Sequence, residues 1–383
     1  MRQRWQWVPL LAAVLAAPSQ AAAPESAYLV GVVSESGDIV SWFRPTVEGG
    51  LVLDREVPIG TMMADIDGPH HLAVAPDQRS YLVSVAHGNP AGTLWRMDAR
   101  TDTLIGRAPL EHFPTTIAVT PDGEFAFVAN SDFHGDRPRI NPVSVVHVPT
   151  MTKMIDVAAC DMPHGVKVNR AGTRVYVSCM HSDEILELHA ASFEILRRQR
   201  IGAGHAMTVA AGQAGGHAAH SGHAASPSSA TPAPSALAGR ACAATYLSLS
   251  PDGRELYVAC NAGNTLQIWE TESLRFLAEV AVGTGAYNAE PTPDGALVLV
   301  TNKKDQSVSL VDTRTRREVA RIRTTKPVVH GIAFAPDGRT AYISSESIGS
   351  DPGSIDVIDL ATRRVTGTVP VRAQPTGIAI LRQ

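Results

Sequence analysis

The 383-residue chain is poor in charged residues, aromatic residues and cysteine. Charged residues make up 18% of the sequence and aromatic residues 5%, and only four cysteines are present. The net charge is −4 and basic residues are not clustered, so the electrostatic footprint of a nucleic-acid-binding protein is missing. No nucleic-acid partner is therefore expected. The hydrophobic content of 44% is still enough for a sizeable core.

Several signatures of catalysis and cofactor attachment are also missing. The chain has no C-x-x-C-H motif, which argues against covalently attached haem. It has no G-x-S-x-G motif, the nucleophile turn of the α/β-hydrolases. No apolar run is long enough to span a bilayer, so a membrane-spanning protein is not expected.

The N-terminal residues have the features of a secretory signal peptide. Arg2 and Arg4 supply the positive charge, an apolar run covers 8–17, and three alanines at 21–23 offer a cleavage site. We therefore predict a Sec-type signal peptide over 1–23 and a periplasmic protein that begins near Pro24. Disulfides are permitted in that compartment.

One short pattern recurs along the rest of the chain. It consists of an apolar strand, a turn of the Pro-Asp-Gly type and a second apolar strand. Two further alternating runs follow each copy, so each unit is predicted to contain four strands. The six copies of the two-strand pattern span 70–86, 115–130, 164–179, 245–260, 287–302 and 330–345.

The two ends of the chain complete a seventh unit. Residues 374–381 form a first strand with nothing after it, and 27–57 supply second, third and fourth strands without a first. We therefore predict an all-β protein, a single seven-bladed β-propeller over 24–383. Its last blade is closed by strands from both termini. Residues 204–240 form a low-complexity, histidine-containing insertion between two blades.

The units resemble the YVTN-type β-propeller family. Blades of that family carry a PDG turn, a Tyr-Val-x-Asn-like strand and an Asp-x-x-Thr turn. The matching segments here are "SPDGRELYVACN" (250–261), "TPDGALVLVTN" (292–302) and "VDTRTRREV" (311–319). The resemblance implies the propeller fold for nearly all of the chain outside the insertion. It leaves the function open, because one fold hosts many activities.

The repeat register gathers histidines on one rim of the predicted propeller. We call the residue six before the turn proline, or its equivalent, the hub position, because it begins the strand that lines the central channel. Imidazole is a common ligand of copper and zinc, so we predict a copper or zinc ion at this rim, with copper favoured. The candidate ligands are His70, His164 and His330 at hub positions, His71 beside them, His87 and His181 in loops of the same rim, and His205, His217, His220 and His223 in the insertion.

The four cysteines form two equivalent pairs. In each pair, one cysteine precedes a first strand and the other ends the second strand, so the two face each other across a hairpin. We favour the disulfides Cys160–Cys179 and Cys242–Cys260. The alternative is a Cu(I) site formed by Cys179, Met180 and His181, whose soft sulfur atoms suit that ion.

Three functions remain open at this stage. The favoured one is a non-catalytic protein that binds or relays a transition metal. A second is an enzyme, because "GPHHLAVAPD" (68–77) resembles the blade openings of lactonase-type propellers; His70, His71, His164, Glu290 and His330 would then be acids, bases or metal ligands. A third is a scaffold for another exported protein, in which the hub histidines are hydrogen-bonded structural residues.

Overall fold

A computed structural model describes residues 27–61, 66–87, 91–133, 140–202 and 242–383. The predicted signal peptide and the histidine-containing insertion lie outside these residues. Within the described residues, no helix has the length and apolar character needed to cross a membrane.

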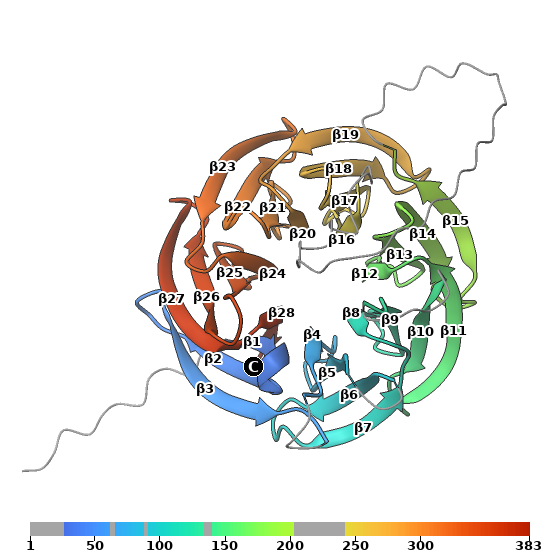
Figure 1. The fold of residues 1–383 in the computed structure, drawn as a ribbon, viewed down its shortest axis with the longest axis horizontal. Coiled ribbons are helices and arrows are strands. Elements are labelled where there is room, and N and C mark those ends of the chain that lie inside the picture. The colour runs from blue at the N-terminus through green and yellow to red at the C-terminus, as the bar shows by residue number, and fades with distance from the viewer. Residues whose placement is uncertain (1–26, 62–65, 88–90, 134–139, 203–241) are drawn as a thin grey trace, which may run out of the picture.

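Seven four-stranded antiparallel sheets form a closed ring, as the repeats predict (Figure 1). We number these blades from the N-terminus. Blade 1 contains β28 (Pro375–Arg382), β1 (Tyr28–Ser34), β2 (Ile39–Pro45) and β3 (Leu51–Pro58). Blades 2, 3 and 4 contain β4 (Pro69–Val74), β5 (Ser80–Val85), β6 (Thr93–Asp98), β7 (Leu104–Pro109), β8 (Pro114–Val119), β9 (Phe125–Asn130), β10 (Asn141–His147), β11 (Thr152–Cys160), β12 (Pro163–Val168), β13 (Arg174–Cys179), β14 (Glu184–His189) and β15 (Ile195–Arg200).

Blades 5 to 7 continue the same order, and the one short 3-10 helix among the described residues, η1 (Glu35–Gly37), joins β1 to β2. The strands of these blades are β16 (Ala244–Leu249), β17 (Glu255–Cys260), β18 (Thr265–Glu270), β19 (Arg275–Ala281), β20 (Ala286–Pro291), β21 (Leu297–Asn302), β22 (Ser307–Asp312), β23 (Arg317–Arg323), β24 (Val328–Phe334), β25 (Thr340–Glu346), β26 (Pro352–Asp359) and β27 (Arg364–Ala373). The first strand of every blade lies at the centre of the ring (Figure 1).

Blade 1 closes the ring with strands from both termini, which confirms the predicted closure. β28 pairs antiparallel with β1, and the paired residues include Leu29 with Leu381 and Gly31 with Ala379. Closure gives β1 a partner on its inner side, so the edge strands of each blade are its first strand, at the channel, and its last strand, on the outer circumference.

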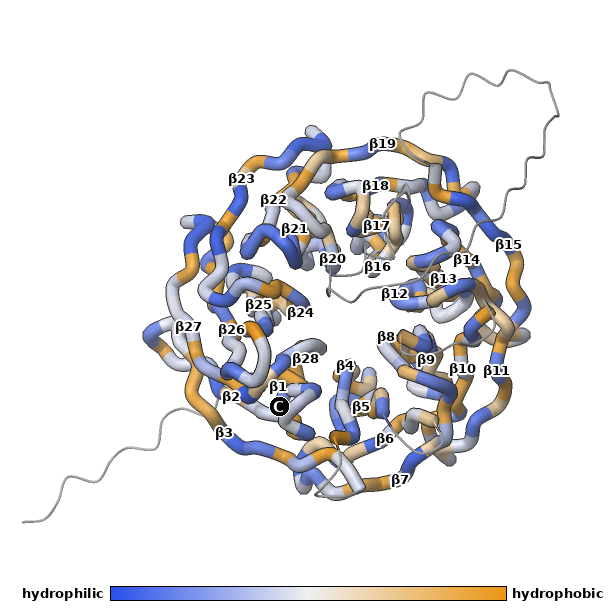
Figure 2. Tube along the Cα trace, in the orientation of Figure 1, coloured by the Kyte–Doolittle hydropathy of each residue, from blue (hydrophilic) through white to orange (hydrophobic). Residues whose placement is uncertain are grey.

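The apolar side chains of each blade pack against the next blade around the ring. One cluster joins blades 1 and 2 through Trp42, Tyr81 and Trp95, and similar clusters recur between the other blades. The outer strands instead alternate between partly buried and exposed residues, as in β15 and β23. Figure 2 shows hydrophilic and hydrophobic residues interspersed along the circumference.

The turns between first and second strands all lie on one rim, which we call the lower rim. Gly253 and Gly295 in these turns have φ angles of 73° and 71°, a region in which glycine is unstrained. Gln78 takes the same left-handed conformation in blade 2 (φ 61°). The hub positions therefore lie toward the opposite, upper rim.

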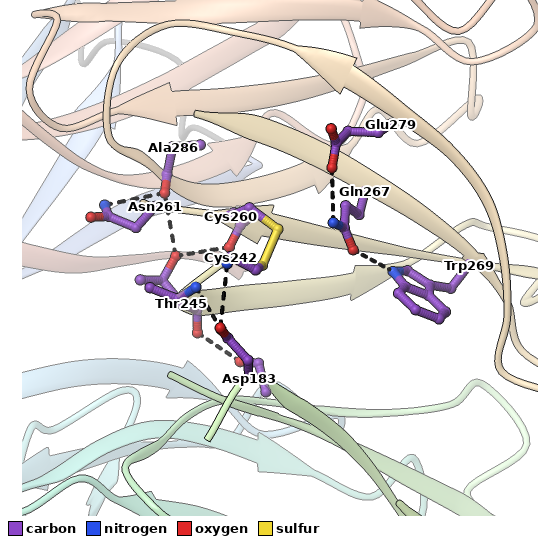
Figure 3. The surroundings of a disulfide bond; sticks show 12 residues. Asp183, Cys242, Thr245, Cys260, Asn261, Gln267, Trp269, Glu279 and Ala286 are labelled. Atoms are coloured by element: carbon purple, nitrogen blue, oxygen red, sulfur yellow. Dashed lines mark hydrogen bonds between the residues drawn. A yellow bond between two sulfur atoms is a disulfide. The ribbon is translucent and has the colours of Figure 1, made fainter. Parts of the chain in front are cut away.

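Both disulfides that the cysteine spacing favours are present. Cys160 is bonded to Cys179 with a Cα–Cα distance of 6.0 Å, and Cys242 to Cys260 with 4.4 Å. Figure 3 shows the second bridge beside Asp183, whose carboxylate accepts hydrogen bonds from the backbone amides at 242 and 243. Since the Cys179 sulfur is in a disulfide, the alternative site of Cys179, Met180 and His181 has no thiolate in this structure.

Candidate metal centre at the hub

Threonine and ring-bearing side chains alternate at the hub positions of blades 1 to 6, and blade 7 adds a further ring, that of His330. Threonines occupy blades 1, 3 and 5, and each hydroxyl donates a hydrogen bond to the backbone carbonyl oxygen of the next blade's hub residue. These bonds run from Thr376 to His70 (2.7 Å), from Thr115 to His164 (3.1 Å) and from Thr245 to Tyr287 (2.6 Å). The threonines thus join neighbouring blades and hold the backbones of the ring-bearing residues in place.

The ring-bearing hub residues are buried and face one another at the upper rim. His70, His164 and His330 are 5%, 0% and 1% exposed, although they come from blades 2, 4 and 7. Six rings form a closed circuit of neighbours, with centroid distances between 4.6 and 5.8 Å. In order, the circuit is His70, Phe113, Phe133, His164, Tyr287 and His330. We call it the hub ring circuit.

His70 is oriented by a carboxylate that the sequence analysis missed. Its Nδ1 lies 2.8 Å from Oε2 of Glu35 in η1. When His70 is neutral, this contact holds the proton on Nδ1 and leaves the lone pair on Nε2. That Nε2 atom is buried and has no hydrogen-bond partner among the described residues.

His330 is the nearest imidazole to His70, with ring centroids 5.8 Å apart and planes at 81°. Neither of its ring nitrogens has a hydrogen-bond partner among the described residues. The nearest carboxylate, that of Glu346, lies 4.0 Å from Nε2, and Glu346 also forms an ion pair with Lys303 at 3.2 Å. Burying an unpaired ring nitrogen is costly, so His330 has free ligand capacity that the fold itself does not use.

His164 lies further round the circuit and is separated from His330 by Tyr287. The Tyr287 hydroxyl is 3.1 Å from Nε2 of His164, and the Nδ1 atom of His164 has no partner among the described residues. Tyr246 packs against the same ring, with centroids 4.9 Å apart. The predicted convergence of three histidines is therefore a close pair, His70 and His330, with His164 reached through a tyrosine.

The electrostatics of the hub keep the imidazoles of His164 and His330 available as ligands. Burial lowers the pKa of both far below the ordinary value of 6.5, and nearby positive charges lower it further. Both rings are therefore neutral at neutral pH. Burial tends to raise the pKa of the Glu35 carboxyl, but the His70 and His87 imidazoles outweigh it and lower that pKa to about 2.

These features fit a metal ion held by two imidazoles. A metal-bound histidine usually gives its second ring nitrogen to a carboxylate, and the pair His70–Glu35 has this arrangement. Within the described parts of the chain, however, no group of three His, Cys, Asp or Glu side chains is arranged to hold an ion. The hub itself thus offers two strong nitrogen ligands.

The remaining predicted ligands lie in different surroundings. His87 Nε2 is 3.7 Å from Oε1 of Glu35, whereas His70 contacts the other carboxylate oxygen, Oε2. His71 faces a cavity below the hub ring circuit. His181 is 3.5 Å from Asp161 and takes no part in the circuit. The insertion's His205, His217, His220 and His223 lie outside the described residues.

The repeat register contained a signal for Glu35 that the sequence analysis did not use. Glu35 follows the second strand of blade 1, and His87 and His181 follow the second strands of blades 2 and 4. Loops at this position open on the upper rim, so Glu35 could have been assigned to it. Phe113 and Phe133 carry no such signal, because their role depends on contacts between blades.

The neutral hub histidines predict acid sensitivity of the metal-free protein. Their pKa is 6.5 when unfolded and far lower when folded, so stability is present above pH 6.5 and is lost as the pH falls. Each group contributes up to about 1.4 kcal/mol per pH unit. We expect His330→Gln to reduce the pH dependence of the unfolding free energy by about this amount per pH unit. Urea denaturation at pH 6.5 and 5.5 measures it. An unchanged slope would show that His330 accepts a proton in the folded state.

The fold is shared with solved structures of low sequence identity. Neither a protein-family model nor a curated protein matches the chain. Hydrazine synthase of Kuenenia stuttgartiensis is 18% identical with a TM-score of 0.62, over 84% of this chain and 93% of that one. A functionally unknown protein from Desulfotomaculum acetoxidans is 14% identical with a TM-score of 0.68, over 92% and 99%. The dihydro-heme d1 dehydrogenase NirN, in complex with DHE, is 14% identical with a TM-score of 0.56, over 95% and 77%. At these identities, the similarities establish the propeller fold alone.

Proposed function

We propose that this protein is an exported, non-catalytic propeller that binds a transition-metal ion, copper in the first place, through His70 and His330. The main support for the proposal is the environment of the buried Nε2 atom of His70. This atom has no partner among the described residues, and the opposite nitrogen, Nδ1, lies 2.8 Å from Oε2 of Glu35. His330, with both nitrogens unpartnered, lies beside it.

Nitrogen ligands of this kind suit Cu(II) and Zn(II), and copper has the higher affinity for a given nitrogen site. Two protein ligands leave further coordination positions open, which suits capture and release better than permanent storage. We propose that the insertion at 204–240 increases the local concentration of imidazole above the hub, because it is rich in histidine and carries no acidic residue.

Two further parts of the proposal concern the class of blade and the compartment. We propose that the blades are of the YVTN type, since five Pro-Asp-Gly or equivalent turns place a positive-φ glycine at the lower rim, at 123, 172, 253, 295 and 338. We also propose that the mature protein is periplasmic. The two disulfides support an oxidising compartment, and the predicted signal peptide supports export.

The test is a metal titration of chelator-treated, untagged protein. The double variant His70→Phe/His330→Phe keeps rings in the hub but removes both ligands, so we expect calorimetry to show loss of the tightest Cu(II) or Zn(II) equivalent. Glu35→Gln should weaken that equivalent about 10- to 100-fold, because it removes the orienting carboxylate.

A matched control removes two histidines from third strands, His147→Gln and His189→Asn, and should leave the tightest equivalent unchanged. If the hub double variant binds both metals as tightly as the parent, the hub histidines are structural. The scaffold interpretation would then be favoured. Hydrolysis of lactones by the parent protein would instead favour the enzyme interpretation.

A further inference from the structure

A second polar site lies in the central channel, below the hub ring circuit. It is a cavity of about 360 Å³, with His330 and Tyr246 on its upper side. Its polar walls include His71, Lys167, Asn288 and Glu290, whereas apolar side chains and two glycines line the rest. The volume lies within the range of small-molecule sites.

The cavity exists because the channel-facing side chains differ in size and polarity around the ring. At one level the first strands of blades 2 and 7 present Ala73 and Ala333, which leave space. At the same level blades 4 and 6 present Lys167 and Glu290, which pair with equivalent residues of their second strands. The channel thus has one wall of small side chains and one polar wall.

The polar wall contains an ion pair that bridges two blades that are not neighbours. Lys167 Nζ contacts Oε1 of Glu290, although blade 5 lies between blades 4 and 6. The two side chains remain 34% and 21% exposed. The pair is therefore accessible from the channel and can exchange its partner for a ligand.

One buried polar atom of the same wall has no partner among the described residues. It is Oδ1 of Asn288, in a residue that is 7% exposed. This oxygen can only accept a hydrogen bond. The wall thus offers two acceptors for an ammonium group, from Asn288 and Glu290, and one cation, Lys167, for a carboxylate.

We propose that this cavity binds a small zwitterion, an α-amino acid or a molecule with the same ammonium and carboxylate groups. The ligand's carboxylate pairs with Lys167. Its ammonium group donates to Glu290 and to Oδ1 of Asn288. The side chain of the ligand lies toward Ala73 and Ala333. The proposed ligand contacts include neither His70 nor His330, so the site does not rest on the metal proposal, although His330 also lines the cavity.

The test is ligand-observed NMR with glycine, L-valine and L-glutamine, in the presence of a chelator. We expect at least one amino acid to bind more tightly than about 1 mM, whereas acetate and ethylammonium, which each carry one of the two charges, bind more weakly. Lys167→Met and Glu290→Gln should each weaken binding more than about tenfold. Ala333→Leu should also abolish it, because it fills the cavity without changing any charge.

Lys304→Met is the matched control, because it removes an exposed lysine outside the cavity. It should leave amino-acid binding unchanged. Failure of all three amino acids to bind the parent protein overturns the proposal. Binding that survives both Lys167→Met and Glu290→Gln also overturns it, whether or not Ala333→Leu folds.

Discussion

A chain that lacks residues 374–383 should lose cooperative unfolding and solubility. β28 is the inner strand of blade 1, and its removal leaves the inner edge of β1 unpaired. It buries Ile378 and Leu381, and each such side chain contributes about 1.5–3 kcal/mol. The truncation also removes Thr376, whose hydroxyl holds the carbonyl oxygen of His70 and whose own carbonyl accepts from Ser344.

These losses are large relative to a total stability of about 5–15 kcal/mol. The exposed edge of β1 is in addition a site for association with other chains. Thermal unfolding followed by circular dichroism, together with size-exclusion chromatography, measures both effects. Deletion of Gln383 alone is the control, since that residue is exposed. A truncated chain as stable and as monodisperse as its control would contradict closure by this strand.

The fold was predictable because its signals are local and repeated. A turn of the Pro-Asp-Gly type between two apolar strands identifies one hairpin, and six copies fix the blade length. The two incomplete ends then require a shared blade, as the pairing of β28 with β1 shows. The disulfides were favoured because the cysteines of each pair flank one hairpin, although Cys160 itself ends β11 and its bridge therefore joins blade 3 to blade 4.

The candidate site was predictable only in part, because it depends on contacts between blades. The register identified the hub positions, but it gave no reason why threonine and ring-bearing residues alternate there. The structure supplies the reason, since each threonine hydroxyl binds the next blade's backbone. The placement of Tyr287 between His164 and His330 also has no local signal. A sequence pattern fixes which rim a residue faces, but not which neighbour its ring meets.

The ion pair of Lys167 and Glu290 illustrates the same limit. The two residues are 123 positions apart and belong to blades separated by a third. Each alone is a charged residue in a first strand, which is unusual for a strand that lines the core. Only the closed ring shows that both face one channel.

Deletion of residues 204–240 should leave a folded protein that keeps its tightest metal equivalent and loses weaker ones. The chain is anchored on both sides of the deletion. β15 ends at Arg200, and beyond the insertion the Asp183 carboxylate accepts from the backbone amides at 242 and 243. The disulfide Cys242–Cys260 then fixes the start of blade 5. A short connector should therefore rejoin the two blades without loss of stability.

Calorimetric titration of Cu(II) or Zn(II) into the deletion, the hub double variant and their combination separates the two sets of histidines. The deletion should retain the equivalent that His70→Phe/His330→Phe loses, and the combination should bind neither metal tightly. The hub supplies oriented, buried nitrogens, whereas the insertion supplies four imidazoles in a low-complexity sequence. We therefore expect the hub to bind the tightest metal equivalent and the insertion to bind the weaker ones. If the deletion instead abolishes all binding while the hub double variant binds as the parent does, the histidines at 205, 217, 220 and 223 form the whole metal site, and the hub ring circuit is structural.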